Sequence, residues 1–161
     1  MEIVRKWLVK EMPNLERAQK ITYERHFLYA QEGTEIRIQH YFDKYEMERK
    51  VLTTKYSSEN QVISISPAEF DYIKTICTKS IFRDGYILES KPVIELKVYH
   101  DLYEGLIRAE VDFKTEAAAK EFETPDWFGI EITESELGKD RNLIQLDREM
   151  FLDTLDSLTK N

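Results

Sequence analysis

The chain has little of several residue types, and each shortage excludes a class of protein. Cys77 is the one cysteine among 161 residues, so neither an intramolecular disulfide nor a cysteine-based metal cluster can form. Five glycines and four prolines are too few for many tight turns or a long flexible linker. No apolar run approaches the roughly 20 residues that a membrane helix needs. The N-terminal segment carries charges through its middle, unlike a signal peptide. We therefore expect a single cytoplasmic domain over residues 1–161.

The composition is that of a folded and acidic protein. Hydrophobic residues make up 42% of the chain and charged residues 34%, which is typical of a globular domain and not of a disordered one. The 31 acidic residues exceed the 23 lysines and arginines, and the formal net charge is −8. A chain of this charge is repelled by nucleic acid and by anionic membranes, so we expect neither as a partner.

A period of two between polar and apolar residues predicts a chain rich in β-strands. The segments with this pattern are residues 2–9, 34–42, 50–56, 60–65, 93–100, 106–113 and 128–133. Segments 93–100 and 106–113 flank a turn at 102–105, which predicts a hairpin.

Helix signals lie between and after these strands. Residues 66–69 (SPAE) combine a capping serine, a proline at the first helical position and a glutamate that completes a capping box. Thr115 can cap the alanine-rich segment 116–122, and residues 147–159 have apolar side chains at near-helical spacing. A short helix is also expected at 14–20. The predicted fold class is α+β, with an antiparallel, strand-dominated core and helices outside.

Charged side chains recur at alternate positions of the strands, which places them on one face. In segment 106–113, Arg108, Glu110 and Asp112 lie opposite an apolar face, and Glu35 shares a face with Arg37 in segment 34–42. Such a face is either the solvent side of an open sheet or the lumen of a closed barrel. In a barrel, inward carboxylates would hold a divalent cation, and inward lysines and arginines an anionic ligand. The pattern by itself leaves both interpretations open.

An ordered series of short motifs resembles the triphosphate tunnel metalloenzyme (CYTH) superfamily. Residues 1–9 start the series, since Glu2 and Lys6 fit the Glu-x-Glu-x-Lys motif of the family's first strand. The later motifs are residues 23–28 (YERHFL), 35–39 (EIRIQ), 51–55 (VLTTK), 95–100 (ELKVYH), 105–113 (GLIRAEVDF) and 127–133 (WFGIEIT). This resemblance spans residues 1–146.

The resemblance implies an eight-stranded antiparallel tunnel barrel with peripheral helices, in which a divalent metal assists attack on a polyphosphate. Members include thiamine triphosphatases, inorganic triphosphatases and class IV adenylyl cyclases. The implied ligands of Mg²⁺ or Mn²⁺ are Glu2, Glu95, Glu110 and Asp112. The implied substrate-binding residues are Lys6, Arg37, Lys55, Arg83 and Lys139. A triphosphate spreads its charge over many oxygens and therefore needs several cationic partners, whereas Mg²⁺ prefers carboxylate oxygens.

The chain departs from the family pattern at many charged positions. Val4 replaces the second glutamate of the first strand, and Lys97 replaces the aspartate of a Glu-x-Asp pair. Asn60 and Val62 stand where another Glu-x-Glu pair is usual, and Gln39, Ser58 and Gly85 stand where arginines are usual. If the hairpin turn centres on residues 103–104, Lys97 lies opposite Glu110 and Glu95 opposite Asp112. Lys97 could then replace the metal as counter-charge, weaken its binding, or contact phosphate.

Three functions therefore stay open. The first is a metal-dependent phosphohydrolase acting on an inorganic or organic triphosphate. The second is a non-catalytic module of the same fold that binds a polyphosphate or nucleotide and has a degenerate metal site. The third is a purely structural or protein-interaction barrel. Cyclase activity is disfavoured, because cyclisation needs two well-placed metals and the acidic set is depleted. A homodimer through the C-terminal helix also stays open, and no catalytic residue is assigned.

Overall fold

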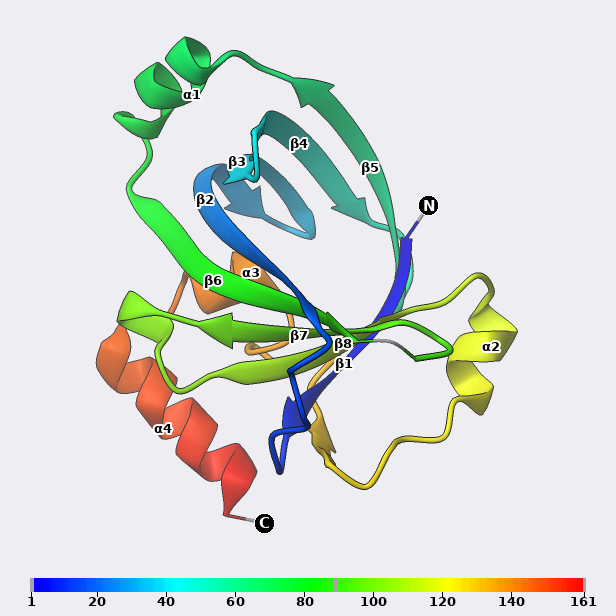
Figure 1. The fold of residues 1–161 in the computed structure, drawn as a ribbon. Helices are drawn as coiled ribbons and strands as arrows, with labels where there is room; N and C mark the ends of the chain where they lie inside the picture. The colour runs from blue at the N-terminus through cyan, green and yellow to red at the C-terminus, as the bar shows by residue number, and fades with distance from the viewer. Residues whose placement is uncertain (1, 89, 161) are drawn as a thin grey trace.

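The structure is a computed structural model and describes residues 2–88 and 90–160 (Figure 1). The strands are β1 (Glu2–Val9), β2 (Gln19–Gln31), β3 (Thr34–Tyr41), β4 (Lys44–Leu52), β5 (Ser57–Ser64), β6 (Lys79–Leu88), β7 (Ile94–Tyr99), β8 (Ile107–Asp112) and β9 (Phe128–Glu131). The helices are α1 (Pro67–Lys74), α2 (Glu116–Glu121), α3 (Asp140–Leu143) and α4 (Arg148–Thr159), with a short 3₁₀ helix, η1, at Asp101–Tyr103.

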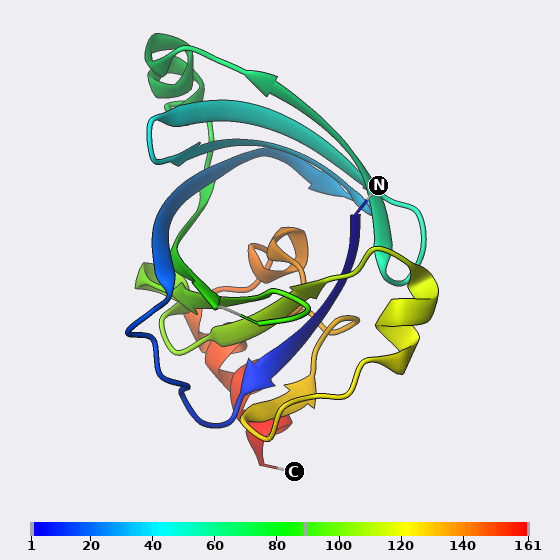
Figure 2. The same cartoon turned by 45° about the vertical axis from the view of Figure 1, so that its right-hand side comes forward.

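Eight of the strands close into an antiparallel barrel. They hydrogen-bond in the order β5-β4-β3-β2-β6-β7-β8-β1, and β5 then pairs with β1 through Ser58 and Glu2 and through Ser57 and Ile3. Figure 2 shows the strands as a ring. β9 adds a ninth strand on β1, where Trp7 is the partner of Glu131. The eight-stranded barrel and the α+β fold class are therefore confirmed.

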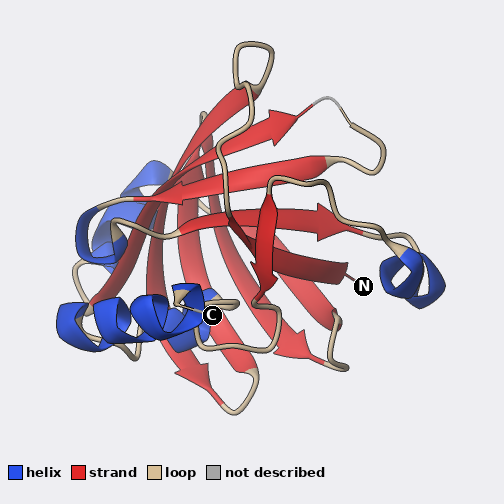
Figure 3. Ribbon diagram, turned by 90° about the horizontal axis from the view of Figure 1, so that it is seen from below, coloured by secondary structure: helices blue, strands red, loops and turns tan. Residues whose placement is uncertain are grey.

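The apolar core falls into two clusters on opposite faces of the barrel strands. In the first cluster, Leu8, Phe27, Ile81 and Tyr99 continue the inward faces of their strands beyond the charged residues and join residues of η1, α3 and α4. Phe151 of α4 is fully buried there, and its ring lies 5.4 Å from that of Tyr103. A second cluster surrounds Trp7, whose ring is 5.0 Å from that of Phe128. Figure 3 shows the helices at the periphery of the strands. Since alternate residues point to opposite faces, Trp7, Ala109 and Val111 lie on the outside of the wall, and the charged residues that alternate with outward residues in β1, β3, β4, β7 and β8 line the interior.

The predicted helix starts are present. The Ser66 hydroxyl accepts a hydrogen bond from the Glu69 N–H at 3.0 Å, and the Glu69 carboxylate accepts one from the Ser66 N–H at 2.8 Å. These two bonds form the capping box of α1. Thr115 caps α2 by accepting from the Ala118 N–H at 3.0 Å. In the described residues, no helix is long and apolar enough to cross a membrane.

Several predicted boundaries are wrong. Residues 14–20 form no helix, because the Asn14 side chain accepts from the Glu16 N–H in a local turn and Gln19 then enters β2. The predicted strands 50–56 and 60–65 are β4 and β5, with the connection at 53–56. β6 and α3 were not predicted. In β6, the inward positions are Arg83, Gly85 and Ile87, so neither face has a uniform character.

The hairpin register also differs from the predicted one. Glu95 pairs with Glu110, and Lys97 pairs with Arg108. The turn is displaced because η1 occupies it, with Asp101 at a φ of 57° and Gly105 at a φ of 111°. Lys97 nevertheless reaches Glu110 diagonally across the two strands.

Candidate functional site

A cavity of about 450 Å³ lies inside the barrel and is lined by its inward side chains and by residues 139–141 at the start of α3. We call it the tunnel. Its cationic lining residues are Lys6, Arg25, Arg37, Lys50, Arg83, Lys97, Arg108, Lys139 and Arg141. Its acidic lining residues are Glu2, Glu35, Glu46, Glu48, Glu95, Glu110, Asp112 and Asp140. The chain carries a net charge of −8, so its lysines and arginines are enriched in the tunnel.

Asp140 is the counter-charge of three buried arginines. Its Oδ2 accepts from Arg25 Nη1 at 2.7 Å and from Arg83 Nη1 at 2.5 Å. Its Oδ1 accepts from Tyr99 Oη at 2.6 Å and from Arg108 Nη2 at 3.2 Å. Burial would raise the pKa of Asp140, but the guanidinium groups outweigh it and hold that pKa well below its usual range. The carboxylate is therefore ionised and fixes the arginines in place.

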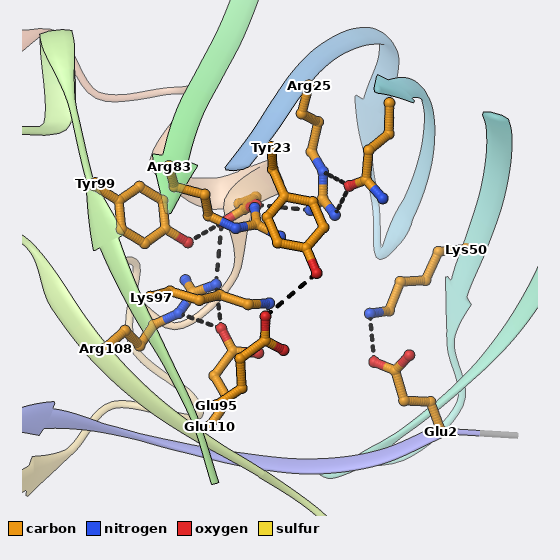
Figure 4. Close-up of polar contacts among 12 residues, drawn as sticks. Glu2, Tyr23, Arg25, Lys50, Arg83, Glu95, Lys97, Tyr99, Arg108 and Glu110 are labelled. Atoms are coloured by element: carbon orange, nitrogen blue, oxygen red, sulfur yellow. Dashed lines mark hydrogen bonds and ion pairs between the residues drawn. The ribbon is translucent and has the colours of Figure 1, made fainter. Parts of the chain in front are cut away.

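Glu110 is held by two cations from neighbouring positions (Figure 4). Lys97 Nζ donates to its Oε1 at 3.0 Å, and Arg108 reaches its Oε2 with Nε at 2.8 Å and Nη2 at 2.7 Å. The side chains of Glu110 and Lys97 are 9% and 12% exposed. Burial opposes ionisation of Glu110, yet Arg108 and Lys97 keep its pKa well below its usual value.

Glu2 is likewise held by a cation. Lys50 Nζ donates to Glu2 Oε1 at 2.8 Å, and Asn60 Nδ2 donates to Oε2 at 3.3 Å. Burial acts to raise the pKa of Glu2, but Lys50 lowers it to about 2. Asn60 also donates to Glu48 Oε2 at 2.7 Å, which links this pair to the network on β4.

Asp112 and Glu95 differ from these acids, because no ion pair to a cation is formed by either within the described residues. Burial and the nearby carboxylates of Glu2 and Glu110 raise the pKa of Asp112 to about 6. Glu95 accepts a long hydrogen bond of 3.4 Å from Tyr23 Oη. Its carboxylate fits because position 85 is glycine, where an added Cβ would lie 2.5 Å from Glu95 Oε1.

Lys6, Lys139 and Arg141 form a basic cluster in the tunnel. In the described part of the chain, none of the three has a hydrogen bond or ion pair to a carboxylate. Burial lowers the pKa of Lys6 well below its usual value, and Arg108, Lys50 and Lys139 add to the effect against the attraction of Glu110. Burial and the neighbouring Arg141 lower the pKa of Lys139 to about 8. The three cations repel each other, and an anion bound between them would relieve that repulsion.

Two buried arginine side chains each have an N–H donor without a hydrogen-bond partner in the described residues. Among the described residues, the Nε–H groups of Arg37 and Arg83 are buried and have no hydrogen-bond partner. Both side chains line the tunnel and are almost inaccessible to solvent. The other nitrogens of Arg37 are held by Glu35 and Glu48. An unpaired buried donor is costly, so these two groups favour an acceptor inside the tunnel.

The structure brings most of the predicted site residues together. Lys6, Arg37, Arg83 and Lys139 line the tunnel, as do Glu2, Glu95, Glu110 and Asp112. The structure does not bring Lys55 to these residues, because β4 ends at Leu52 and Lys55 is not among the residues that line the tunnel. Its side chain is 52% exposed and pairs with Glu134 at 3.2 Å.

Sequence reasoning missed three lining cations, namely Arg25, Lys50 and Arg141, and it placed Arg108 on the charged face with Glu110 and Asp112 without assigning it a ligand. One signal could have found Lys50, which follows Glu46 and Glu48 at alternate positions of β4. Arg25 has no such local signal, since its partner Asp140 lies 115 residues away.

The four expected metal ligands do not form a ligand set. Within residues 2–88 and 90–160, no three His, Cys, Asp or Glu side chains lie together as a metal ion requires. The oxygens of Glu110 and Glu2 accept hydrogen bonds from Lys97, Arg108, Lys50 and Asn60 instead. The residues of this tunnel therefore do not fit a resident divalent metal, and no catalytic step is derived through one.

The closed barrel, with its tunnel lined by both acidic and basic side chains, is the fold expected of a triphosphate tunnel protein. Solved structures confirm that fold. No protein-family model matches the chain, and no curated protein does. The crystal structure of the inorganic triphosphatase NE1496 matches it with a TM-score of 0.70 and 25% identity, over 91% of this chain and 95% of that one.

Two further structures have lower identity and support the fold alone. A putative adenylyl cyclase from Hippeastrum, HpAC1, described as having a dominant triphosphatase activity, gives a TM-score of 0.59 at 12% identity. It covers 74% of this chain and 83% of that one. A conserved hypothetical protein from Pyrococcus furiosus gives 0.56 at 14% identity, over 75% and 85%. The resemblance to the triphosphate tunnel metalloenzymes is thus confirmed in fold.

Proposed function

We propose that this chain binds an inorganic or organic triphosphate in the tunnel and hydrolyses it. The observation that carries the proposal is the basic cluster of Lys6, Lys139 and Arg141, which lines the tunnel and, in the described residues, forms no hydrogen bond or ion pair with a carboxylate. Buried like charges are unfavourable unless an anion joins them. The likeness to an inorganic triphosphatase supports triphosphate as that anion.

The chain's own residues account for binding and for part of the chemistry. Fixed cations in a cavity screened from water stabilise the charge that develops on phosphoryl oxygens, and they need no reorganisation during the reaction. Burial and the neighbouring cations lower the pKa of Lys6, whereas Glu110 and a bound polyphosphate favour its charged form. Lys6 is therefore a proposed phosphate contact.

The family resemblance implies that Mg²⁺ or Mn²⁺ assists this reaction, and metal dependence is part of what has to be tested. When bound, such a metal would polarise a phosphoryl oxygen. The present ion pairs of Glu2 and Glu110 speak against a preformed site for it.

A second candidate function is the non-catalytic module that binds a polyphosphate or nucleotide. A specific observation favours it, namely the network of Lys97, Arg108 and Glu110, in which cations occupy both carboxylate oxygens of an expected metal ligand. Such a module would hold the anion by the same basic cluster and would release no phosphate.

One experiment separates these candidates. Phosphate release from inorganic triphosphate and from ATP is measured with Mg²⁺, with Mn²⁺ and with EDTA, and binding of both compounds is measured by calorimetry. Lys6→Met serves as the inactive comparison and Lys55→Met as the control outside the tunnel. Release that Lys6→Met abolishes and Lys55→Met leaves intact supports the hydrolase. Binding without release selects the non-catalytic module, and absence of both refutes a triphosphate function.

A further inference from the structure

Both oxygens of two of the expected metal ligands, Glu110 and Glu2, already accept hydrogen bonds from nitrogen donors. Glu110 receives Lys97 on one oxygen at 3.0 Å and Arg108 on the other at 2.8 Å and 2.7 Å. Glu2 receives Lys50 at 2.8 Å and Asn60 at 3.3 Å. A carboxylate in charge-assisted hydrogen bonds has to lose them before it can ligate a metal ion. A divalent cation therefore competes with built-in cations at each of these acids.

Lys97 lies beside the carboxylates of Glu95 and Glu110 in the tunnel (Figure 4). Lys97 lies on β7, and its cross-strand neighbours are Gly85 on β6 and Arg108 on β8. Its charge acts on Glu2, Glu110 and Asp112, each of which it favours in the ionised form. Its side chain is 12% exposed, so its ammonium group is poorly screened by water. A second cation placed among the same carboxylates would be repelled by it.

An ammonium group can perform part of a metal's task for a polyphosphate. It carries three N–H donors, and in the described structure one of them is used, by Glu110. The side chain lines the tunnel, so its remaining donors are available to phosphate oxygens. Unlike a metal ion, this ammonium group is covalently attached to the protein.

We infer that the tunnel takes its polyphosphate as the metal-free anion, with Lys97 as the built-in counter-charge in place of a divalent metal. This inference rests on the proposed function and specifies the form of its ligand. Magnesium then acts as a competitor, because it binds the polyphosphate in solution and lowers the concentration of the free anion.

The wild-type protein gives the first test. Sodium tripolyphosphate is titrated into it by calorimetry, once in EDTA and once with excess Mg²⁺. We expect binding in EDTA, and an apparent affinity that is about tenfold weaker with Mg²⁺, which corresponds to about 1.4 kcal/mol. Mn²⁺ alone, followed by electron paramagnetic resonance, should remain free at millimolar concentration.

Two variants at position 97 give the second test. Lys97→Met removes the charge and keeps most of the volume, and it should weaken tripolyphosphate binding in EDTA about tenfold. Lys97→Asp adds a carboxylate beside Glu95 and Glu110, and it should acquire Mn²⁺ binding. The matched controls are Lys55→Met and Lys55→Asp, which make the same changes outside the tunnel and should match the wild type. Circular dichroism confirms that each variant is folded.

The outcomes separate this inference from the proposed function. Wild-type binding that requires Mg²⁺, or Mn²⁺ bound by the wild type alone, overturns the inference and leaves the proposed function standing. Lys97→Met that binds as tightly as the wild type in EDTA also overturns it. A wild type that binds tripolyphosphate in neither medium refutes the proposed function itself. If a variant does not fold, the two wild-type measurements still decide.

Discussion

Substitution of Asp140 by asparagine is the sharpest test of how the tunnel is held together. Asp140 is 5% exposed and accepts four hydrogen bonds, from three guanidinium groups and the Tyr99 hydroxyl. Asp140→Asn keeps the size of the side chain but leaves Arg25, Arg83 and Arg108 without this counter-charge. Loss of one partner from a buried ion pair costs about 3–5 kcal/mol, and we expect a free-energy loss in that range.

Urea denaturation measures this loss directly. With a slope of about 2 kcal/mol per molar urea, the midpoint should fall by roughly 1.5–2.5 M. The melting temperature should fall by roughly 6–20 °C. The matched control is Asp84→Asn, on the outer face of β6. Its carboxylate accepts from Thr22 and His100 near solvent, so a loss below about 1 kcal/mol is expected.

The same variant has a pH dependence of known sign. Because the folded pKa of Asp140 is depressed, its stabilising contribution is complete above the unfolded pKa of about 3.9 and is lost as the pH falls toward the folded value. The wild type and Asp140→Asn should therefore converge in stability in acid. A variant that is as stable as the wild type at pH 7, within about 1 kcal/mol, would refute Asp140 as the shared counter-charge.

Three further predictions concern binding, protonation and the loop before α3. Lys139→Ala should weaken tripolyphosphate binding about tenfold in calorimetry, whereas Lys55→Ala should change it less than about twofold, and equal effects would contradict the tunnel assignment. The pKa of Asp112 is raised to about 6, so its ionisation lowers the stability of the fold as the pH rises from about 4 to about 6. In chemical denaturation, Asp112→Asn should therefore be more stable than the wild type at pH 7.5, and this advantage should be lost at pH 4. The gain should be less than about 1 kcal/mol, because water reaches the side chain. Gly138→Ala would place a Cβ 2.0 Å from the Ile132 carbonyl oxygen, so it should lower the free energy of unfolding by about 1–3 kcal/mol in urea denaturation. It should also weaken tripolyphosphate binding, because the loop that carries Lys139 must shift. An unchanged urea midpoint would contradict this packing.

The sequence predicted the strands whose two faces differ in character. In β1, β3 and β8, charged residues alternate with apolar ones, and these strands were located within one or two residues. β6 escaped because Gly85 and Ile87 interrupt its inward charged face. The helix at 14–20 was a wrong prediction, because an Asx turn imitates a helix start but is followed by a strand. The sequence could not show that the charged faces point inward, because this depends on closure of the barrel by the long-range pairing of β5 with β1.

Only those site residues that belong to a local sequence pattern or to a family motif could be predicted. Lys6, Arg37, Arg83 and Lys139 were correctly expected to meet, although their roles stay predictions. Lys55 was misplaced because the end of β4 could not be read from alternation alone. The pairing of Lys97 depended on the hairpin register, which the 3₁₀ turn shifts. The link between Arg25 and Asp140 arises from tertiary structure, and no pattern in the sequence encodes it.

The most direct test of the central claim is a crystal structure of the protein soaked with sodium tripolyphosphate in the presence of EDTA. The account predicts density for the chain of phosphates inside the barrel, in contact with Lys6, Lys139 and Arg141. An empty tunnel at saturating ligand, or phosphates bound on the outer surface alone, would contradict the claim that this basic cluster exists to hold a polyphosphate.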